Sequence, residues 1–489
     1  MTIGFIRKFS LAYLILPNIL FSLGWFRQPY STVMVIGFLY LLFINTNTDD
    51  EANIFSRNEV FYLIVFAAIW TFFCGVDGLA TQKLDWAAHN AKYYDLFKNS
   101  WPNFFAEQDR FSCYYFGYYL VPAFLSKQIG HLLPCLLIVW TGVGFFLGLA
   151  WIFILIGRNK FLLLLMPFLR GTGQLAATVL SKFNLYDGQI PLLNPSMRSV
   201  FQQSSYAPNQ VIAAMIVTGV TLYSFKKKKL GDSFTFIVAS FIWAIFPSII
   251  LVLIFASIFI NQYFFRGNLG DFLEDKPVSN YVIPGLVFLP IFGYFLSSDQ
   301  ISDQGFLWDY RPYQGMLYGY LTGIVLDILF FYATIRFLSK NESAYPKWFV
   351  VMLFMFVFIL STYYMGMFND FFFRGSIPLQ IIIVTILLAA VNSALKSKSW
   401  PSSMSFYSAS LILTILIIVG MASEVHLLRD NCVVAKFLPG SVKFERYSYD
   451  RYPNTYQTIK AMWGERGAKE YLGAKNSFFE RHLSKKLPE

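Results

Sequence analysis

The apolar run LLPCLLIVWTGVGFFLGLAWIFILI, residues 132–156, decides the fold class because it carries no charged side chain. A helix needs about 20 apolar residues to cross the hydrocarbon core of a bilayer. Similar runs recur along the chain, which is 56% hydrophobic and 14% charged, whereas soluble domains carry about 25% charged residues. An open sheet leaves backbone groups unsatisfied in lipid, and a barrel would alternate over segments of about ten residues. The sequence therefore predicts an all-α polytopic membrane protein.

Counting these runs predicts about thirteen transmembrane helices, within a range of about 11–14. The predicted spans lie near residues 9–26, 31–45, 60–75, 132–156, 161–180, 206–225, 232–247, 248–264, 279–297, 316–338, 348–366, 375–395 and 404–423. The stretch 232–264 contains two spans only if the chain turns near Pro247, and each of them would be short.

Lysine and arginine positions predict the orientation of the chain. With thirteen spans, the basic connectors all fall on one side, and cytoplasmic connectors carry such an excess. The residues in question are Arg7, Lys8, Arg158, Lys160, Lys226 to Lys229, Arg336, Lys340, Lys347, Lys396 and Lys398. We therefore expect a multi-pass protein of the inner (cytoplasmic) membrane, with its N-terminus in the cytoplasm and its C-terminus outside. The net charge of +11 is spread over connectors, so no nucleic-acid partner is predicted.

The longer polar segments then gather on the outer face. The first large outer loop, residues 76–131, is expected to carry interfacial amphipathic helices. The remaining outer loops are 181–205, 298–315 and 367–374. The polar and aromatic stretch 424–489 is long enough for a small docked domain. The sequence thus divides into a transmembrane domain, 1–423, and an outer-face C-terminal tail domain, 424–489.

The first outer loop holds the candidate catalytic residues. Asp85, His89 and Lys92 are spaced i, i+4 and i+7, so a helix would place them on one face. A carboxylate beside a histidine in a partly dry cleft can act as a general base. Asp85, Asp77 and His89 are therefore candidate catalytic residues, and Lys92 is a candidate substrate ligand. The alternative is an interfacial helix whose charges simply face water.

Tyr114-Tyr-Phe-Gly-Tyr-Tyr-Leu-Val-Pro122 follows in the same loop. The stretch is short and rich in tyrosine, a residue that favours the level of the lipid headgroups. It predicts a second surface helix leading into the span at 132–156. An aromatic belt without substrate contact would give the same pattern.

Further candidates for substrate binding are basic or aromatic. Arg170 lies within a predicted span, where an arginine needs an anionic partner or a wet cavity, unless the span ends early. Arg374 opens another span and can hold a phosphate through two parallel hydrogen bonds, or it can pair with Asp370 at the helix end. Arg198 and Trp308 come from outer loops that either line a cleft or are solvated connectors.

Several familiar site patterns are absent from the sequence. It contains no phosphate-binding glycine loop, no His-x-x-x-His zinc pattern and no nucleophile elbow. Its four cysteines have no metal-like spacing. No metal ligand is predicted from the residues themselves.

The order of these segments resembles the GT-C class of membrane glycosyltransferases. Asp85-Trp-Ala-Ala-His-Asn-Ala and Tyr114-Tyr-Phe-Gly-Tyr-Tyr-Leu are similar to stretches of the bacterial and archaeal tyrosine-rich "YYY" membrane proteins. Asn369-Asp-Phe-Phe-Phe-Arg-Gly-Ser-Ile-Pro resembles a stretch of similar bacterial proteins. The specific likeness covers roughly sixty residues near the N-terminus and ten near the C-terminus. Many relatives place the large loop after the first span, whereas here two further spans precede it.

The resemblance implies transfer of a sugar from a polyprenyl-phosphate lipid carrier to a glycan, lipid or protein acceptor on the outer face. It implies a loop aspartate, Asp85 or Asp77, that acts as base or helps to bind a divalent cation. It also implies that basic residues, Arg374 with Arg170, hold the lipid phosphate. Two alternatives stay open: a transporter or flippase for an anionic or lipid-linked substrate, and a non-catalytic membrane scaffold.

Overall fold

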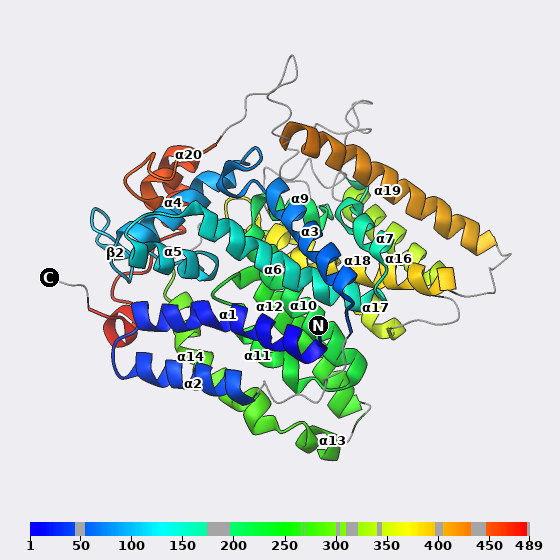
Figure 1. Ribbon diagram of the computed structural model, residues 1–489, viewed down its shortest axis with the longest axis horizontal. Helices are drawn as coiled ribbons and strands as arrows, with labels where there is room; N and C mark the ends of the chain where they lie inside the picture. Colours follow the sequence, from blue (N-terminus) through cyan, green and yellow to red (C-terminus); the bar gives the residue numbers. More distant parts are fainter. Residues whose placement is uncertain are drawn as a thin grey trace.

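The protein is built mostly of helices that pack into one bundle (Figure 1). The structure is a computed structural model and describes residues 1–44, 54–173, 196–265, 267, 269–299, 304–309, 321–339, 345–396, 404–431 and 446–486. The helices of the first half are α1 (Ile3–Trp25), α2 (Tyr30–Ile44), α3 (Arg57–Phe73), η1 (Val76–Gly78), α4 (Asp85–Lys98), α5 (Gly117–Ile129), α6 (Pro134–Leu155), α7 (Lys160–Leu165), η2 (Met166–Phe168), α9 (Val200–Tyr206), α10 (Pro208–Lys227) and α11 (Gly231–Ala239).

The second half continues the bundle and ends in the tail. Its helices are α12 (Ile245–Ile260), η3 (Asn261–Phe265), α13 (Leu269–Glu274), η4 (Val278–Val282), α14 (Ile283–Phe295), η6 (Leu321–Val325), α16 (Leu326–Leu338), α17 (Lys347–Ser361), α18 (Asp370–Lys396), α19 (Met404–Asn431), α20 (Thr455–Lys469) and η8 (Phe479–Leu483). Two antiparallel strand pairs join β1 (Phe104–Phe105) to β2 (Arg110–Phe111) and β3 (Gln304–Phe306) to β4 (Tyr363–Met365).

Five helices among the described residues are long and apolar enough to cross a membrane. They are α1, α6, α12 continued by η3, η4 continued by α14, and α18. Shorter apolar helices are α2, α17 and the Ser410–Ala422 part of α19. The prediction of a helical chain with several membrane-length helices is confirmed, whereas the number thirteen stays a prediction.

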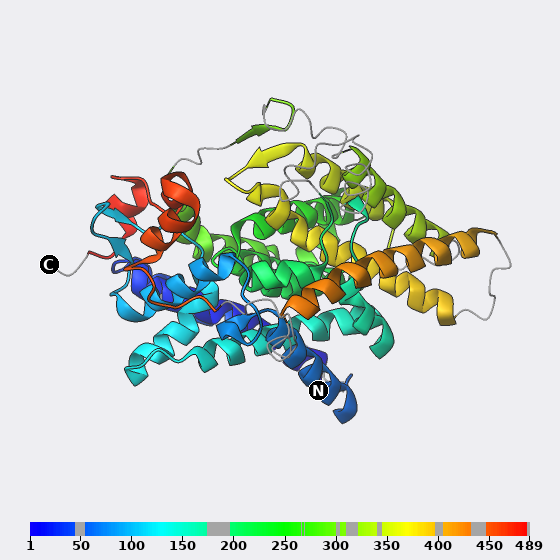
Figure 2. The same ribbon diagram turned by 90° about the horizontal axis from the view of Figure 1, so that it is seen from above.

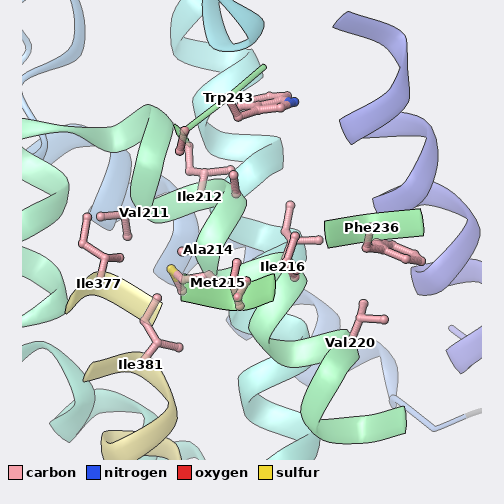
Figure 3. Packing of buried hydrophobic residues seen from close by; sticks show 14 of the residues in the cluster. Val211, Ile212, Ala214, Met215, Ile216, Val220, Phe236, Trp243, Ile377 and Ile381 are labelled. Carbon is pink, nitrogen blue, oxygen red and sulfur yellow. The ribbon is translucent and has the colours of Figure 1, made fainter. Parts of the chain in front are cut away.

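Helix α10 lies at the centre of the bundle and is buried from Pro208 to Ser224. It packs against α6, α18, α11 and α12. A Cβ on Gly219 would lie 2.3 Å from the Cβ of Trp151 in α6, so the two backbones approach closely there. Figure 3 shows the side chains of α10 between Ile377 of α18 on one side and Phe236 of α11 on the other. A helix that is apolar on all sides belongs in such a core.

The span predicted at 161–180 is wrong as a continuous helix. Helix α7 ends at Leu165 and a single 3₁₀ turn, η2, follows it. Pro167 lies in that turn, and proline lacks the N–H that an α-helix would need. The backbone is extended at Leu169, and residues 174–180 lie outside the described residues.

The two spans predicted within 232–264 differ in length. Helix α11 covers nine residues, too few to cross a bilayer, whereas α12 with η3 covers 21. The turn between them lies at 240–244 instead of near Pro247. Pro247 stands in the first turn of α12, where a proline costs little because that N–H has no helical partner.

The first outer loop forms a layer of helices at one end of the bundle, together with the tail. Helices α4, α5 and α20 lie side by side there in Figures 1 and 2, and α4 packs against both others. The alternative that α4 is an interfacial helix whose charges simply face water is wrong, because ten of its fourteen residues are buried. The second predicted helix begins at Gly117, so Tyr114 and Tyr115 precede it. The tail covers α4 and removes it from water.

Two of the basic connectors contact other segments of the bundle. The guanidinium of Arg158 donates a hydrogen bond to the carbonyl of Ile54. The ammonium of Lys226 lies 4.8 Å from the ring centroid of Tyr345. Gln262 donates to the carbonyl of Lys228 at 2.9 Å. The connectors at Arg158 and at Lys226 to Lys229 are thus packed within the described part of the bundle, while Lys340 and Lys398 lie outside the described residues. The cytoplasmic orientation of these connectors stays a prediction.

Candidate active site

A cavity lies where α4, the start of α18 and the tail meet. Its empty volume, including space open to solvent, is about 540 Å³. The ionisable and amide side chains that line it are Asp85, His89, Lys92, Gln210, Asp370, Arg374 and Glu470. Its aromatic lining residues are Tyr114, Tyr115, Phe368, Trp463 and Tyr471. A concave site with a few convergent polar groups among aromatic rings is the usual form of a small-molecule site.

Arg374 joins two of the three carboxylates of the cavity. Its Nη2 donates to Oδ2 of Asp85 at 2.6 Å, although the two residues lie 289 positions apart. Its Nε lies 3.4 Å from Oδ1 of Asp370, one helical turn earlier. Asp85 and Asp370 are the first residues of α4 and α18, where the helix dipole favours a negative charge. Asp370 and Arg374 share one stretch of the sequence, and the fold brings Asp85 to them from a distant segment.

Lys92 is held by aromatic rings. Its ammonium lies 3.8 Å from the ring centroid of Tyr114 and 5.0 Å from that of Tyr471, and the side chain is 2% exposed. Burial lowers the pKa of Lys92 to about 7, the charge of Asp85 opposes this, and that of Arg374 adds to it. Ring faces attract a cation without neutralising it. Lys92 can therefore offer its charge to an anion that enters the cavity.

His89 has both ring nitrogens engaged. Nδ1 accepts from the hydroxyl of Tyr119, and Nε2 donates to the carbonyl of Tyr206 at 2.8 Å, a tautomer assigned from these partners. Burial lowers the pKa of His89, and the charge of Lys92 lowers it further. The imidazole is thus neutral and joins α4 to α5 and α9. The geometry gives His89 a positioning role in place of the expected catalytic one.

Two other predicted arginines lie next to this site without lining the cavity. The guanidinium carbon of Arg198 lies 4.0 Å from the ring centroid of Phe373, the residue before Arg374. Burial lowers the pKa of Arg198 to about 10, Tyr206 opposes the shift, and the charges of Arg374 and Arg170 add to it. Both of the other guanidinium groups are therefore close enough to Arg198 to disfavour its charge.

Arg170 is buried, with 3% of its surface exposed, and it follows the early end of the predicted span. Its acidic neighbours are Asp327 and Glu424. Asp327 also accepts hydrogen bonds from the backbone N–H groups of Gly173 and Met197, both at 2.9 Å. Arg170 thus has the anionic partners that a buried arginine requires.

Asp77 and Trp308 lie elsewhere. Asp77 pairs with Arg446 of the tail at 2.7 Å and accepts from the hydroxyl of Tyr449 at 3.0 Å. Trp308 is 60% exposed and stacks on Phe306 beside strand β3. Of the two loop acids, Asp85 lines the cavity, whereas Asp77 fixes the tail.

Glu470, Trp463 and Tyr471 of the tail were not predicted as site residues, nor was Gln210 of α10. The tail lies far from its contacts on α4 in the sequence, as the separation of 360 positions between Thr455 and Asp95 shows. Local spacing cannot reveal such a contact. Its aromatic and charged composition is the only signal in the sequence.

No protein-family model, curated protein or solved structure matches this chain. The site must therefore be judged from its own geometry.

A divalent cation, which the resemblance allows, does not fit the residues of the cavity. Arg374 takes one oxygen of Asp85 and one of Asp370. Across the described residues, no group of three or more His, Cys, Asp or Glu side chains has an arrangement that could hold a metal ion. A guanidinium occupies the place between the two carboxylates.

The tail is anchored to α4 by Asp95. Its Oδ2 accepts from the backbone N–H of Thr455 at 2.7 Å and from the hydroxyl of Thr455 at 2.6 Å, and 1% of the residue is exposed. Burial raises the pKa of Asp95 from 3.8 to about 6, although the bonds from Thr455 oppose the shift.

We expect tail docking to weaken as the pH rises from about 4 to about 6. A carboxyl whose folded pKa is raised favours the folded state when protonated, so that advantage, about 3 kcal/mol at most, is lost through the folded pKa. Hydrogen exchange of the α20 amides, corrected for intrinsic rates, would measure it. Asp95→Asn should abolish the dependence. Asp109→Asn, which breaks the exposed tail contact with Lys475, should retain it; equal slopes in wild type and Asp95→Asn would contradict the assignment.

Proposed function

We propose that the protein transfers a sugar from a polyprenyl-phosphate donor to an acceptor hydroxyl at this cavity, on the outer face of the membrane. One observation carries the proposal. Asp85 and Arg374, from distant parts of the chain, meet at 2.6 Å in a cavity that also holds the ammonium of Lys92. This is the convergence of a loop acid with basic groups at the end of the bundle that the GT-C resemblance implies.

Asp85 is the proposed general base. Its carboxylate takes the proton of the acceptor hydroxyl as that oxygen attacks the anomeric carbon of the sugar. The bond between that carbon and the phosphate oxygen breaks, and its electron pair leaves with the lipid phosphate. Arg374 touches Asp85 through Oδ2 and also pairs with Asp370. This pairing orients the carboxylate of Asp85 at the edge of the cavity.

The departing lipid phosphate gains negative charge and needs a cation near it. Lys92 lines the cavity and is held by ring faces instead of by a carboxylate hydrogen bond. The guanidinium of Arg198 packs on the ring of Phe373, close enough to Arg374 for the two charges to interact. We assign Lys92 to the phosphate, with Arg198 as a second cation that raises the local positive potential.

The decisive test uses the purified full chain in proteoliposomes. The donor is polyprenyl-phosphate glucose labelled in the sugar, and a panel of neutral disaccharides serves as acceptors. A covalent labelled product that requires the protein supports the enzyme. Label that crosses the bilayer without a product would instead identify a transporter. A scaffold would give neither a product nor transport. Its cellular role would be lost when the tail is removed and kept when the acidic residues are substituted.

The donor KM should rise about tenfold between roughly pH 6 and pH 9, because Lys92, whose pKa burial lowers to about 7, loses its charge over this range. The phosphodiester of the donor keeps its charge throughout. Lys92→Met should give a high KM at every pH, and Lys92→Arg should flatten the profile at a low KM. Lys98→Met is the matched control, because this exposed lysine on α4 also lies over a tyrosine ring. If Lys92→Met showed the same dependence of donor KM on pH as the wild type, the assignment of Lys92 to the donor phosphate would be wrong.

A further inference from the structure

The tail supplies one complete wall of the cavity. Trp463, Gly467, Glu470 and Tyr471 all line it. Backbone hydrogen bonds from two other segments of the chain fix the wall at its C-terminal end. The backbone N–H of Cys113 donates to the carbonyl of Tyr471 at 2.9 Å, and the backbone N–H of Asp299 donates to the carbonyl of Leu472 at 2.8 Å. The wall is therefore a built part of the site.

The chemistry of this wall differs from that of the opposite side. Trp463 meets Phe368 edge to face at 5.5 Å, and Tyr471 stacks on Tyr114 at 4.7 Å. Between them, Glu470 accepts from the backbone N–H of Met367 at 3.2 Å through one oxygen. Burial, together with the negative charge of Asp370, raises the pKa of Glu470 to about 7.

Aromatic rings and carboxylates together match the two surfaces of a sugar. The C–H groups of a pyranose ring form an apolar face that packs on an indole or phenol ring. The hydroxyl edge donates hydrogen bonds to carboxylate oxygens. Trp463 offers the ring, and Glu470 and Asp370 offer acceptors on the same cavity.

The charges of the cavity select against an acidic sugar. Its lining holds three carboxylates, Asp85, Asp370 and Glu470, and two cations, Lys92 and Arg374. Arg374 is already matched by two of the carboxylates. A carboxylate brought in beside Glu470 would face like charges in a partly desolvated site, which costs binding energy.

We propose that the tail wall, centred on Trp463 and Glu470, binds a neutral saccharide and is the acceptor subsite. The saccharide site stands on its own residues, while its role as acceptor subsite rests on the proposed glycosyl transfer. The donor phosphate then lies on the side of Lys92, and the acceptor hydroxyl reaches Asp85 from the side of the tail.

The first experiment measures binding without a donor. The purified full chain in nanodiscs is titrated with labelled neutral hexose disaccharides and with a uronic-acid disaccharide of the same size. We expect at least one neutral disaccharide to bind and the acidic one to bind about tenfold more weakly. Trp463→Ala should weaken binding about tenfold and Glu470→Gln severalfold. Phe478→Ala, an exposed tail aromatic away from the cavity, should change it less than twofold.

The second experiment measures transfer and separates the two proposals. If the chain transfers sugar, Trp463→Ala should raise the acceptor KM and leave the donor KM unchanged. Disaccharide binding without any transfer would defeat the proposed enzyme yet leave the saccharide site standing. The inference is overturned if no neutral disaccharide binds, if the acidic one binds equally well, or if Trp463→Ala changes neither binding nor acceptor KM.

Discussion

Replacing Arg374 with methionine is expected to destabilise the protein by about 2–4 kcal/mol, because two partly buried carboxylates lose their common counter-charge. The side chains of Asp85 and Asp370 are 24% and 32% exposed, and that of Arg374 is 14% exposed. Removing the arginine alone costs more stability than removing the arginine and both carboxylates together, since unpaired charges then remain in a desolvated site. Thermal unfolding in detergent, followed by tryptophan fluorescence, would measure the loss.

Two variants make this result specific. The triple variant Asp85→Asn, Asp370→Asn, Arg374→Met should regain most of the lost stability, because it leaves no unpaired charge. Arg446→Met breaks a pair of the same length with Asp77, but the arginine side chain there is 52% exposed. That change should cost less than about 1 kcal/mol. If the single and triple variants unfolded at the same temperature, Arg374 would have no special electrostatic role.

Asp85→Asn is expected to lower the rate of sugar transfer by about 10²–10⁴-fold, the usual contribution of a positioned general base. The variant should stay folded, because Arg374 keeps its second partner, Asp370, at 3.4 Å. The amide of asparagine fills the same volume but cannot take the proton of the acceptor hydroxyl. The measurement is kcat with labelled donor and a neutral disaccharide acceptor.

The controls for this prediction are two other acid substitutions. Asp85→Glu keeps a base, so it should retain more activity than Asp85→Asn. Asp77→Asn changes the loop acid that pairs with the tail, and it should lower transfer only a few-fold. Near-normal transfer by Asp85→Asn would show that another group takes the proton of the acceptor hydroxyl. Asp370, another carboxylate of the cavity, would then be the next candidate for the base.

Local patterns were sufficient to predict part of the site. Asp85, His89 and Lys92 line one cavity because a helix repeats every 3.6 residues, and this spacing is visible in the sequence. Arg374 with Asp370 one turn before it follows from the same rule. What each group does was less predictable. The two ring nitrogens of His89 are taken by Tyr119 and Tyr206, which come from other helices.

The errors in the predicted fold arise where a local pattern is overruled by a proline or by a long-range contact. Residues 161–180 are apolar enough for a span, but Pro167 ends the helix. Beyond it, the carboxylate of Asp327 in α16 accepts a hydrogen bond from the backbone N–H of Gly173. The charges of α4 were compatible both with a partly dry site and with a helix that faces water. Their burial depends on the tail, which covers α4 through Asp95 and Thr455.

The sequence by itself determined that the chain is helical with membrane-length apolar segments. These properties depend on composition and on residues within a few helical turns of each other, where hydrophobicity and backbone geometry act directly. The tertiary structure alone decided which acid meets Arg374, and that Trp463 and Glu470 complete the cavity. Contacts across more than 280 positions depend on how all the intervening helices pack, which no local pattern encodes.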